Sequence, residues 1–263
     1  MPVVFDNVDV NGLKLGPVKS SKSAAGCKTA YILDKNGSRL NIQTPVMPIP
    51  WDITMRQMDP NQNFSCAMSV SFSNESEDQD VSKFKQFLTD IDSKIKLLAS
   101  KESGSLGKKA EEKVINSHFK DSIKQASNGD YPPTFQPKVW LKCKEEGSMK
   151  CIDDVSMDLK VFNMDQEEIS PSLLKKGCPA ALIVSPSYIW ASALGVGITW
   201  VATQVITQPL EEKKCGFDMK NSVFDQFKRK REEDTELTSK KFAEDREYSS
   251  VEDDPIEDDD EQF

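Results

Sequence analysis

The longest uncharged stretch of the chain runs from Gly177 to Leu210, thirty-four residues in a protein in which 29% of residues are charged. Over 196–207 its residues alternate between two sides of an extended chain, and Trp200 falls on the more apolar side. Many residues of this segment are β-branched, which favours a strand. With a second strand over 181–193, the pattern predicts two antiparallel strands at the centre of a closed sheet, with Trp200 in the core.

The same stretch is also long enough to cross a bilayer, which takes about 20 apolar residues. However, Pro186 interrupts any helix that could span it, and Ser, Thr and Gln dilute the apolar residues. The first residues, MPVVFDNVDVNG, contain neither the basic nor the apolar region of a signal peptide. We therefore expect an intracellular protein with no membrane contact. The alternative is an anchored protein that spans the membrane at 180–206.

A helical period replaces the alternation after residue 80. The first stripe, at i, i+3, i+4 and i+7 spacing, consists of Val81, Phe84, Phe87, Leu88, Ile91, Ile95 and Leu98. A weaker stripe follows over 106–126, with Ala110, Val114, Ile115, Phe119 and Ile123 facing inward. Together the two stripes predict a helical hairpin over 80–126, inserted between strands, in which His118 is structural.

Shorter alternating segments predict the remaining strands. They are 29–33, 39–44, 66–72, 138–144 and 158–163, and Lys35-Asn36-Gly37-Ser38 is typical of a turn that joins the first two as a hairpin. The expected fold is therefore mainly β, a closed barrel with an inserted α-helical hairpin.

The charge divides sharply along the chain. From Glu232 to the end there are fifteen acids and three bases, a net −12 in a chain of net −9, so residues 1–231 carry +3. A mildly basic body with a strongly acidic tail suggests a nucleic-acid binder.

Candidate binding chemistry lies in two segments of the body. In 138–144, Lys138, Trp140 and Lys142 share one side of the predicted strand, so that cations for phosphates flank a flat ring for bases. Lysines also gather among small residues in GPVKSSKSAAGCK, where the backbone could approach a phosphate chain closely. The alternatives are a solvated strand and a solvated loop.

Enzyme and metal chemistry find no support in the sequence. The six cysteines are scattered without CxxC pairs, and there is a single histidine, so we expect reduced thiols, no metal and no cofactor. HExxH, GxSxG and phosphate-binding Gly-rich motifs are absent, and no catalytic residue is predicted.

The end of the chain is polar and charged, and we expect 232–263 to be disordered. Its last residues, VEDDPIEDDDEQF, combine eight acids with a terminal aromatic ring. Such a segment could dock a basic partner or occupy the protein's own cationic groove. The preceding cluster, Lys228 to Arg231, is readable as an import signal or as part of a nucleic-acid footprint.

Three segments resemble the replication single-stranded DNA-binding proteins of short-tailed coliphages and their relatives in large nucleocytoplasmic DNA viruses. They are Val18-Lys19-Ser20-Ser21-Lys22-Ser23 with Ala30-Tyr31, the pair Tyr188-Ile189-Trp190 and Gly197-Ile198-Thr199-Trp200, and the tail to Phe263. The resemblance implies an OB-fold-like barrel and an acidic tail ending in Phe. The helical hairpin is larger than in the phage proteins.

The resemblance and the residue patterns together predict the site. Phosphate contacts are expected from Lys19, Lys22, Lys28, Arg39, Lys138 and Lys142, and base stacking from Tyr31, Trp140 and Trp190. Docking of replication partners, a DNA polymerase and a helicase or primase, is expected from Asp258, Asp259, Asp260, Glu261 and Phe263.

The predicted organisation is an OB-fold-like binding domain over 1–215, a basic linker over 216–231 and the acidic tail over 232–263. The predicted function is sequence-nonspecific binding of single-stranded DNA in viral replication, recombination or repair, in the host nucleus or at a cytoplasmic replication site. The sequence does not decide whether the chain forms a homodimer. The rival to this function, beside the membrane anchor, is an acidic-tail chaperone or structural protein that binds no DNA.

Overall fold

A computed structural model describes residues 2–21, 26–57, 63–126, 128–143 and 149–208. They belong to one compact unit, Met1–Leu210. The basic linker, the import-signal candidate and the acidic tail lie outside the described residues, and so does Lys22.

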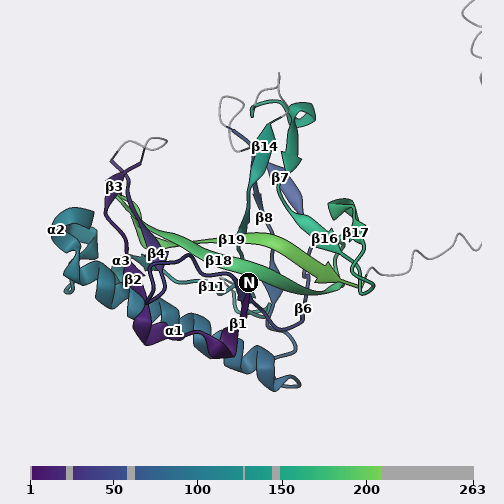
Figure 1. Ribbon diagram of the computed structural model, residues 1–263, viewed down its shortest axis with the longest axis horizontal. Coiled ribbons are helices and arrows are strands. Elements are labelled where there is room, and N and C mark those ends of the chain that lie inside the picture. The colour runs from purple at the N-terminus through teal and green to yellow at the C-terminus, as the bar shows by residue number, and fades with distance from the viewer. Residues whose placement is uncertain (1, 22–25, 58–62, 127, 144–148, 209–263) are drawn as a thin grey trace, which may run out of the picture. The chain divides into compact units, whose positions relative to one another are not determined.

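The described part of the chain is mainly β (Figure 1). Its strands are β1 Val3–Val4, β2 Lys14–Leu15, β3 Lys19–Ser20, β4 Lys28–Leu33, β5 Ile42–Gln43, β6 Met47–Pro48, β7 Thr54–Arg56, β8 Ser65–Ala67, β9 Val70–Ser71, β10 Phe119–Lys120, β11 Ile123–Lys124, β12 Thr134–Phe135, β13 Lys138–Val139, β14 Leu141–Cys143, β15 Val155–Met157, β16 Lys160–Phe162, β17 Glu168–Ile169, β18 Pro179–Ser192 and β19 Gly195–Thr207. Its α-helices are α1 Gln79–Lys101, α2 Ser103–Leu106 and α3 Ile115–His118.

The uncharged stretch forms the long antiparallel hairpin β18–β19, as its alternation predicts. Along β18, the first half pairs with β5 and β6 and the second half with β4. Along β19, the parallel partners are β10, β13 and β16. Trp200 is only 4% exposed, which confirms its place in the core. Among the described residues, no helix is long and apolar enough to cross a membrane.

The sheet around this hairpin is open, so the prediction of a closed barrel is wrong. Its main path runs β1-β5-β18-β19-β13-β8-β7, and the two end strands do not pair with each other. A barrel closes only when its edge strands meet. Here the end strands are only two and three residues long, and each pairs with a different inner strand, β1 with β5 and β7 with β8.

Helix α1 is the predicted first helix, and its apolar stripe is buried. Asp78 caps its first turn by accepting from the backbone N–H groups of Asp80 and Val81. The rings of Phe84 and Phe135 pack edge to face with 5.8 Å between their centroids, and those of Phe135 and Trp200 do so with 5.2 Å between theirs. This aromatic chain packs α1 against the inner face of the β18–β19 hairpin.

The predicted second helix over 106–126 is wrong. Gly107 has a φ of 106°, which ends α2, and the following residues form the short helix α3 and the strands β10 and β11. Phe119 and Lys120 pair with Val196 and Gly197 of β19. Tertiary pairing with the hairpin therefore overrides a weak helical pattern.

The predicted hairpin between 29–33 and 39–44 is also wrong, although the turn between them forms. The Asp34 carboxylate accepts from the N–H groups of Asn36 and Ser38. Both edges of β4 are already taken, by β18 on one side and by β2 and β3 on the other. The returning chain therefore forms β5, which pairs with β1 and β18.

Two other predicted strands are each divided between sheets. The segment 66–72 contributes to β8 in the main sheet and forms β9 in a three-stranded sheet with β12 and β11. The segment 138–144 becomes β13, which pairs with β8 and β19, and β14, which pairs with β15. Trp140 lies at this second break, where its carbonyl accepts from the Asp158 N–H at 2.7 Å.

Candidate nucleic-acid interface

The strand register places one row of predicted site residues on the outer face of the main sheet. Tyr31 of β4 is opposite Tyr188 of β18, and Thr29 lies between Lys19 of β3 and Trp190 of β18. Residues directly opposite each other in a sheet share a face. The residues that alternate with them, among them Ala30 and Ile189, are buried in the core. In Figure 1, α1 runs along one side of β18 and β19, and β14 and β7 rise from the other side.

A hollow of about 450 Å³ lies on this outer face. Four predicted residues from three separate segments line it: Lys19, Tyr31, Arg39 and Trp140. Tyr188 and the neighbouring Ser187, where the register between β18 and β19 shifts, complete its wall together with Pro17, Ser20, Ser21 and Thr29. We call this cavity the Tyr31 hollow.

The aromatic rings of the Tyr31 hollow are accessible. Tyr31 is 41% exposed and Trp140 is 45% exposed, whereas rings that serve only the core, such as Phe84 and Phe135, are fully buried. The Arg39 guanidinium lies over the Tyr31 ring, 4.6 Å from its centroid. The rings therefore present flat surfaces on which a base could stack.

The cations of the hollow are available for an anionic ligand. Among the ion pairs of the described residues, none involves Lys19 or Arg39. The described residues that line the hollow include no acid. The chemistry of the hollow is that of cations beside exposed rings.

Three predicted residues are placed differently. Lys28 alternates with Thr29 along β4, and its Nζ donates to the Ser105 carbonyl on the opposite side of the sheet. Lys142 pairs with Asp158, with 2.7 Å between Nζ and the carboxylate. Trp190 shares the outer face, but its ring lies against Gly197, where an added Cβ would come within 2.9 Å of a ring carbon. Their roles in binding stay predictions.

Lys138 lies outside the Tyr31 hollow, in an adjoining hollow that also contains Trp140. Trp51 and Arg56 line that second cavity and are not among the residues predicted from the sequence. Tyr188 is not among them either, although it stands two residues before Trp190 and therefore on the same side of the strand. That spacing was the signal available for Tyr188. Trp51 and Arg56 carried no comparable pattern.

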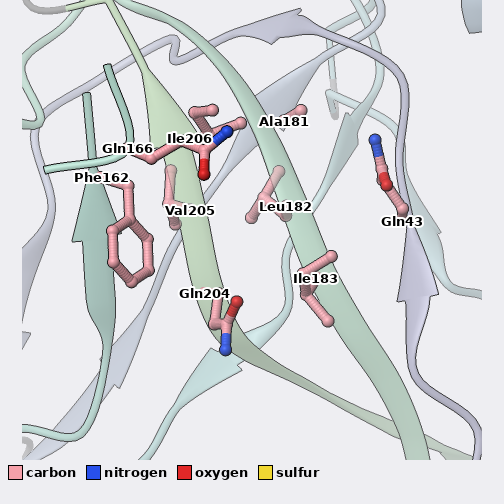
Figure 2. Close-up of a pocket in the computed structure, with 9 residues that line it drawn as sticks. All are labelled: Gln43, Phe162, Gln166, Ala181, Leu182, Ile183, Gln204, Val205 and Ile206. Carbon is pink, nitrogen blue, oxygen red and sulfur yellow. The ribbon is translucent and has the colours of Figure 1, made fainter. Parts of the chain in front are cut away.

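A further pocket of about 360 Å³ lies where the first half of β18 meets the end of β19 (Figure 2). Its lining combines apolar residues with three amides, Gln43, Gln166 and Gln204, and contains no charged residue. None of the predicted site residues lines it. A pocket without cations does not provide phosphate binding.

The second hollow also contains the thiol of Cys66. Burial raises the pKa of the Cys66 thiol, at the second hollow, to about 11, so it stays protonated at neutral pH. Within the described ranges, no group of three or more His, Cys, Asp or Glu residues is arranged to hold a metal ion.

Comparison with known proteins gives matches among solved structures only. No family model matches the chain, and neither does any curated protein. The single-stranded DNA-binding protein of bacteriophage Enc34, in complex with single-stranded DNA, is 16% identical, with a TM-score of 0.37 over 76% of this chain and 97% of that chain. Gp2.5, a single-stranded DNA-binding protein encoded by bacteriophage T7, is 11% identical, with a TM-score of 0.39 over 69% and 98%.

The chain is similar to phage single-stranded DNA-binding proteins. The Enc34 protein without DNA also matches, with 16% identity and a TM-score of 0.35 over 81% of this chain and 99% of that chain. The resemblance noted in the sequence is thus found again among solved structures.

Proposed function

We propose that this chain binds single-stranded DNA without sequence preference, at the Tyr31 hollow. The observation that carries the proposal is the meeting of two exposed rings, Tyr31 and Trp140, with two cations, Lys19 and Arg39, that form no ion pair with a described acid. They come from separate parts of the sequence, and the fold gathers them on the face that α1 leaves uncovered.

The mechanism combines stacking with neutralisation of the backbone. Each base that stacks on a ring contributes about 1–3 kcal/mol, and every base has a flat face, so stacking reads no sequence. In a duplex the bases already stack on one another, which makes an unpaired strand the better ligand. Each phosphate that contacts a cation makes the affinity fall with salt, with a slope of about −0.7 per contact.

The test is a titration of the full chain with oligo-dT at several salt concentrations, followed by tryptophan fluorescence. We expect saturable quenching, because a base stacked on Trp140 quenches its emission, and we expect a duplex of the same length to bind more weakly. Lys19→Gln combined with Arg39→Gln should lower the salt slope by about 1.4. Lys101→Gln, an exposed lysine in the last turn of α1, is the matched control. No quenching by oligo-dT at low salt would reject the function.

The proposal extends to the acidic tail. At low DNA concentration the tail competes for the cationic face, and its end docks a DNA polymerase and a helicase or primase through Asp258, Asp259, Asp260, Glu261 and Phe263. Its support is the charge division at Glu232, which gives the body a net +3 against −12 for the tail. The process served would be replication, recombination or repair of viral DNA inside the cell.

A further inference from the structure

A second hollow of about 500 Å³ adjoins the Tyr31 hollow, and Trp140 lines both. Its other walls come from β7, β8 and β13, and from the segment around Trp51. Lys138 and Thr54 are both opposite Ala67 in the sheet, and Arg56 is two residues beyond Thr54 on the same strand. Lys138 and Arg56 therefore share one face. We call this cavity the Trp51 hollow.

Trp51 provides this hollow with an accessible ring held in position. The indole is 44% exposed, and its Nε1 donates to the Ser69 hydroxyl at 3.2 Å. Together with Trp140, at 45% exposure, two indoles border the same cavity. A fixed ring that stays open to solvent suits the stacking of a flat ligand.

The charges of the Trp51 hollow favour an anion. Arg56 and Lys138 take part in none of the ion pairs of the described residues. Arg56 donates from Nε to the Thr54 hydroxyl at 3.3 Å, and no described residue accepts from the outer N–H groups of its guanidinium. Among the described residues that line it, Asp52 is the one acid, and its carboxylate accepts from the Lys176 backbone N–H at 2.7 Å.

We infer that the Trp51 hollow is a second nucleotide-binding site for the same DNA strand. The inference rests on the proposed function: a strand held at the Tyr31 hollow continues past Trp140, and its next nucleotides stack on Trp51 while Arg56 and Lys138 contact their phosphates. Trp140 then lies between two base-binding sites. A short oligonucleotide fills one hollow, and a longer one fills both.

The test compares oligo-dT of about 4 nucleotides with oligo-dT of about 16, the range of site sizes known for single OB folds. Trp51→Ala in the full chain should weaken binding of the long oligonucleotide by about 5- to 150-fold, the equivalent of one lost base stack. The short oligonucleotide should change little, because the Tyr31 hollow still holds it. Trp51→Phe, which keeps a ring, should restore most of the affinity. Tyr131→Ala, an exposed ring that lines neither hollow, is the control.

A second pair of variants tests the same site even if the Trp51→Ala protein does not fold. Lys138→Gln and Arg56→Gln should each lower the salt slope by about 0.7 for the long oligonucleotide and leave the slope of the short one unchanged. If neither length binds to the wild-type chain, the proposed function itself fails. If the long oligonucleotide binds and responds to Tyr31→Ala but not to Trp51→Ala, Arg56→Gln or Lys138→Gln, the second site is rejected and the function stands. Equal weakening of both lengths by Trp51→Ala also rejects it.

Discussion

The guanidinium of Arg39 lies over the ring of Tyr31, with its central carbon 4.6 Å from the ring centroid. Tyr31 belongs to β4, whereas Arg39 follows the turn that Asp34 closes, so the turn brings the cation back over the strand. This pair joins the two components of the proposed mechanism in one place. The Arg39 guanidinium contacts the Tyr31 ring, and both side chains lie on the outer face of the main sheet.

Substitutions in this pair should separate stacking from charge. We expect Tyr31→Ala to weaken oligo-dT binding by about 5- to 150-fold without changing the salt slope, because a stacked ring releases no counterions. Arg39→Gln should lower the slope by about 0.7. Tyr31→Phe should bind nearly as well as wild type. Fluorescence titrations over a series of salt concentrations measure both quantities. A changed slope in Tyr31→Ala would contradict the assignment of the ring to stacking.

Trp140, which lies between strands β13 and β14, is the subject of a second prediction. Trp140→Ala should weaken binding at constant salt slope, since the ring borders both hollows and carries no charge. Unfolding of Trp140→Ala with unchanged affinity per folded molecule would assign this ring to the core instead.

Lys142 and Lys19 provide a matched comparison of charge. Lys142 forms an ion pair with Asp158, with 2.7 Å between Nζ and the carboxylate oxygen, whereas Lys19 pairs with no acid in the described part of the chain. Lys142→Gln should therefore lower the salt slope by less than the decrease of about 0.7 expected for Lys19→Gln. An equal decrease in both variants would mean that DNA displaces Asp158 from Lys142.

The buried carboxyl of Asp92 should make stability depend on pH. Burial raises the pKa of Asp92 to about 6, although hydrogen bonds from the Ser122 N–H and hydroxyl act to lower it. The indole N–H of Trp200 donates to the same Ser122 hydroxyl. A raised pKa in the folded state means that this contribution to stability is complete below the ordinary value of 3.8 and is lost as the pH rises through about 6.

Asp92→Asn removes this titration. Relative to the variant, the free energy of unfolding of the wild type should fall by about 2 kcal/mol between about pH 4 and about pH 7.5. Urea denaturation at the two pH values measures the difference. Asp90→Asn, at an exposed position of the same helix, is the control. A constant difference between wild type and Asp92→Asn across this range would show that Asp92 does not titrate there.

Removal of the tail should strengthen DNA binding. A chain that ends at Arg231 loses a net −12 of competing charge, so it should bind oligo-dT at least as tightly as the full chain, with the largest gain at low salt. Changing Asp258, Asp259 and Asp260 to Asn in the full chain should give an intermediate affinity. Weaker binding by the shortened chain at low salt would end the competition hypothesis.

Deletion of Phe263 should affect partners rather than DNA. It removes a ring whose burial contributes about 1.5–3 kcal/mol and leaves the neighbouring acids in place. Oligo-dT affinity should hardly change, while recovery of the cognate DNA polymerase in a pull-down should fall tenfold or more. Phe263→Leu, which keeps an apolar end, should recover an intermediate amount. Equal recovery by the wild-type and deleted chains would leave the terminal ring without a docking role.

Periodicity alone determined the parts of this protein whose pattern is long and local. The alternation over 196–207 placed Trp200 in the core, and the stripe from Val81 to Leu98 defined α1, because each side chain's direction follows from its position along one strand or helix. The alternation over 138–144 also predicted Trp140 as a ring on the outside, whereas Tyr31 was predicted from the resemblance to the phage proteins. The acidic tail follows from composition alone.

Only the tertiary structure decided how the segments meet. The pattern over 106–126 predicted a helix, but two strands form there, because β10 pairs with β19 and β11 pairs with β12. Residues within 39–44 pair with β18 because both edges of β4 are already occupied. Lys19 and Lys28 looked alike in the sequence, yet the register of β3 and β4 put them on opposite faces. The Tyr31 hollow brings Lys19, Tyr31 and Arg39 together with Trp140 and Tyr188. Such long-range contacts depend on which strand edges remain free, a property that no local pattern encodes.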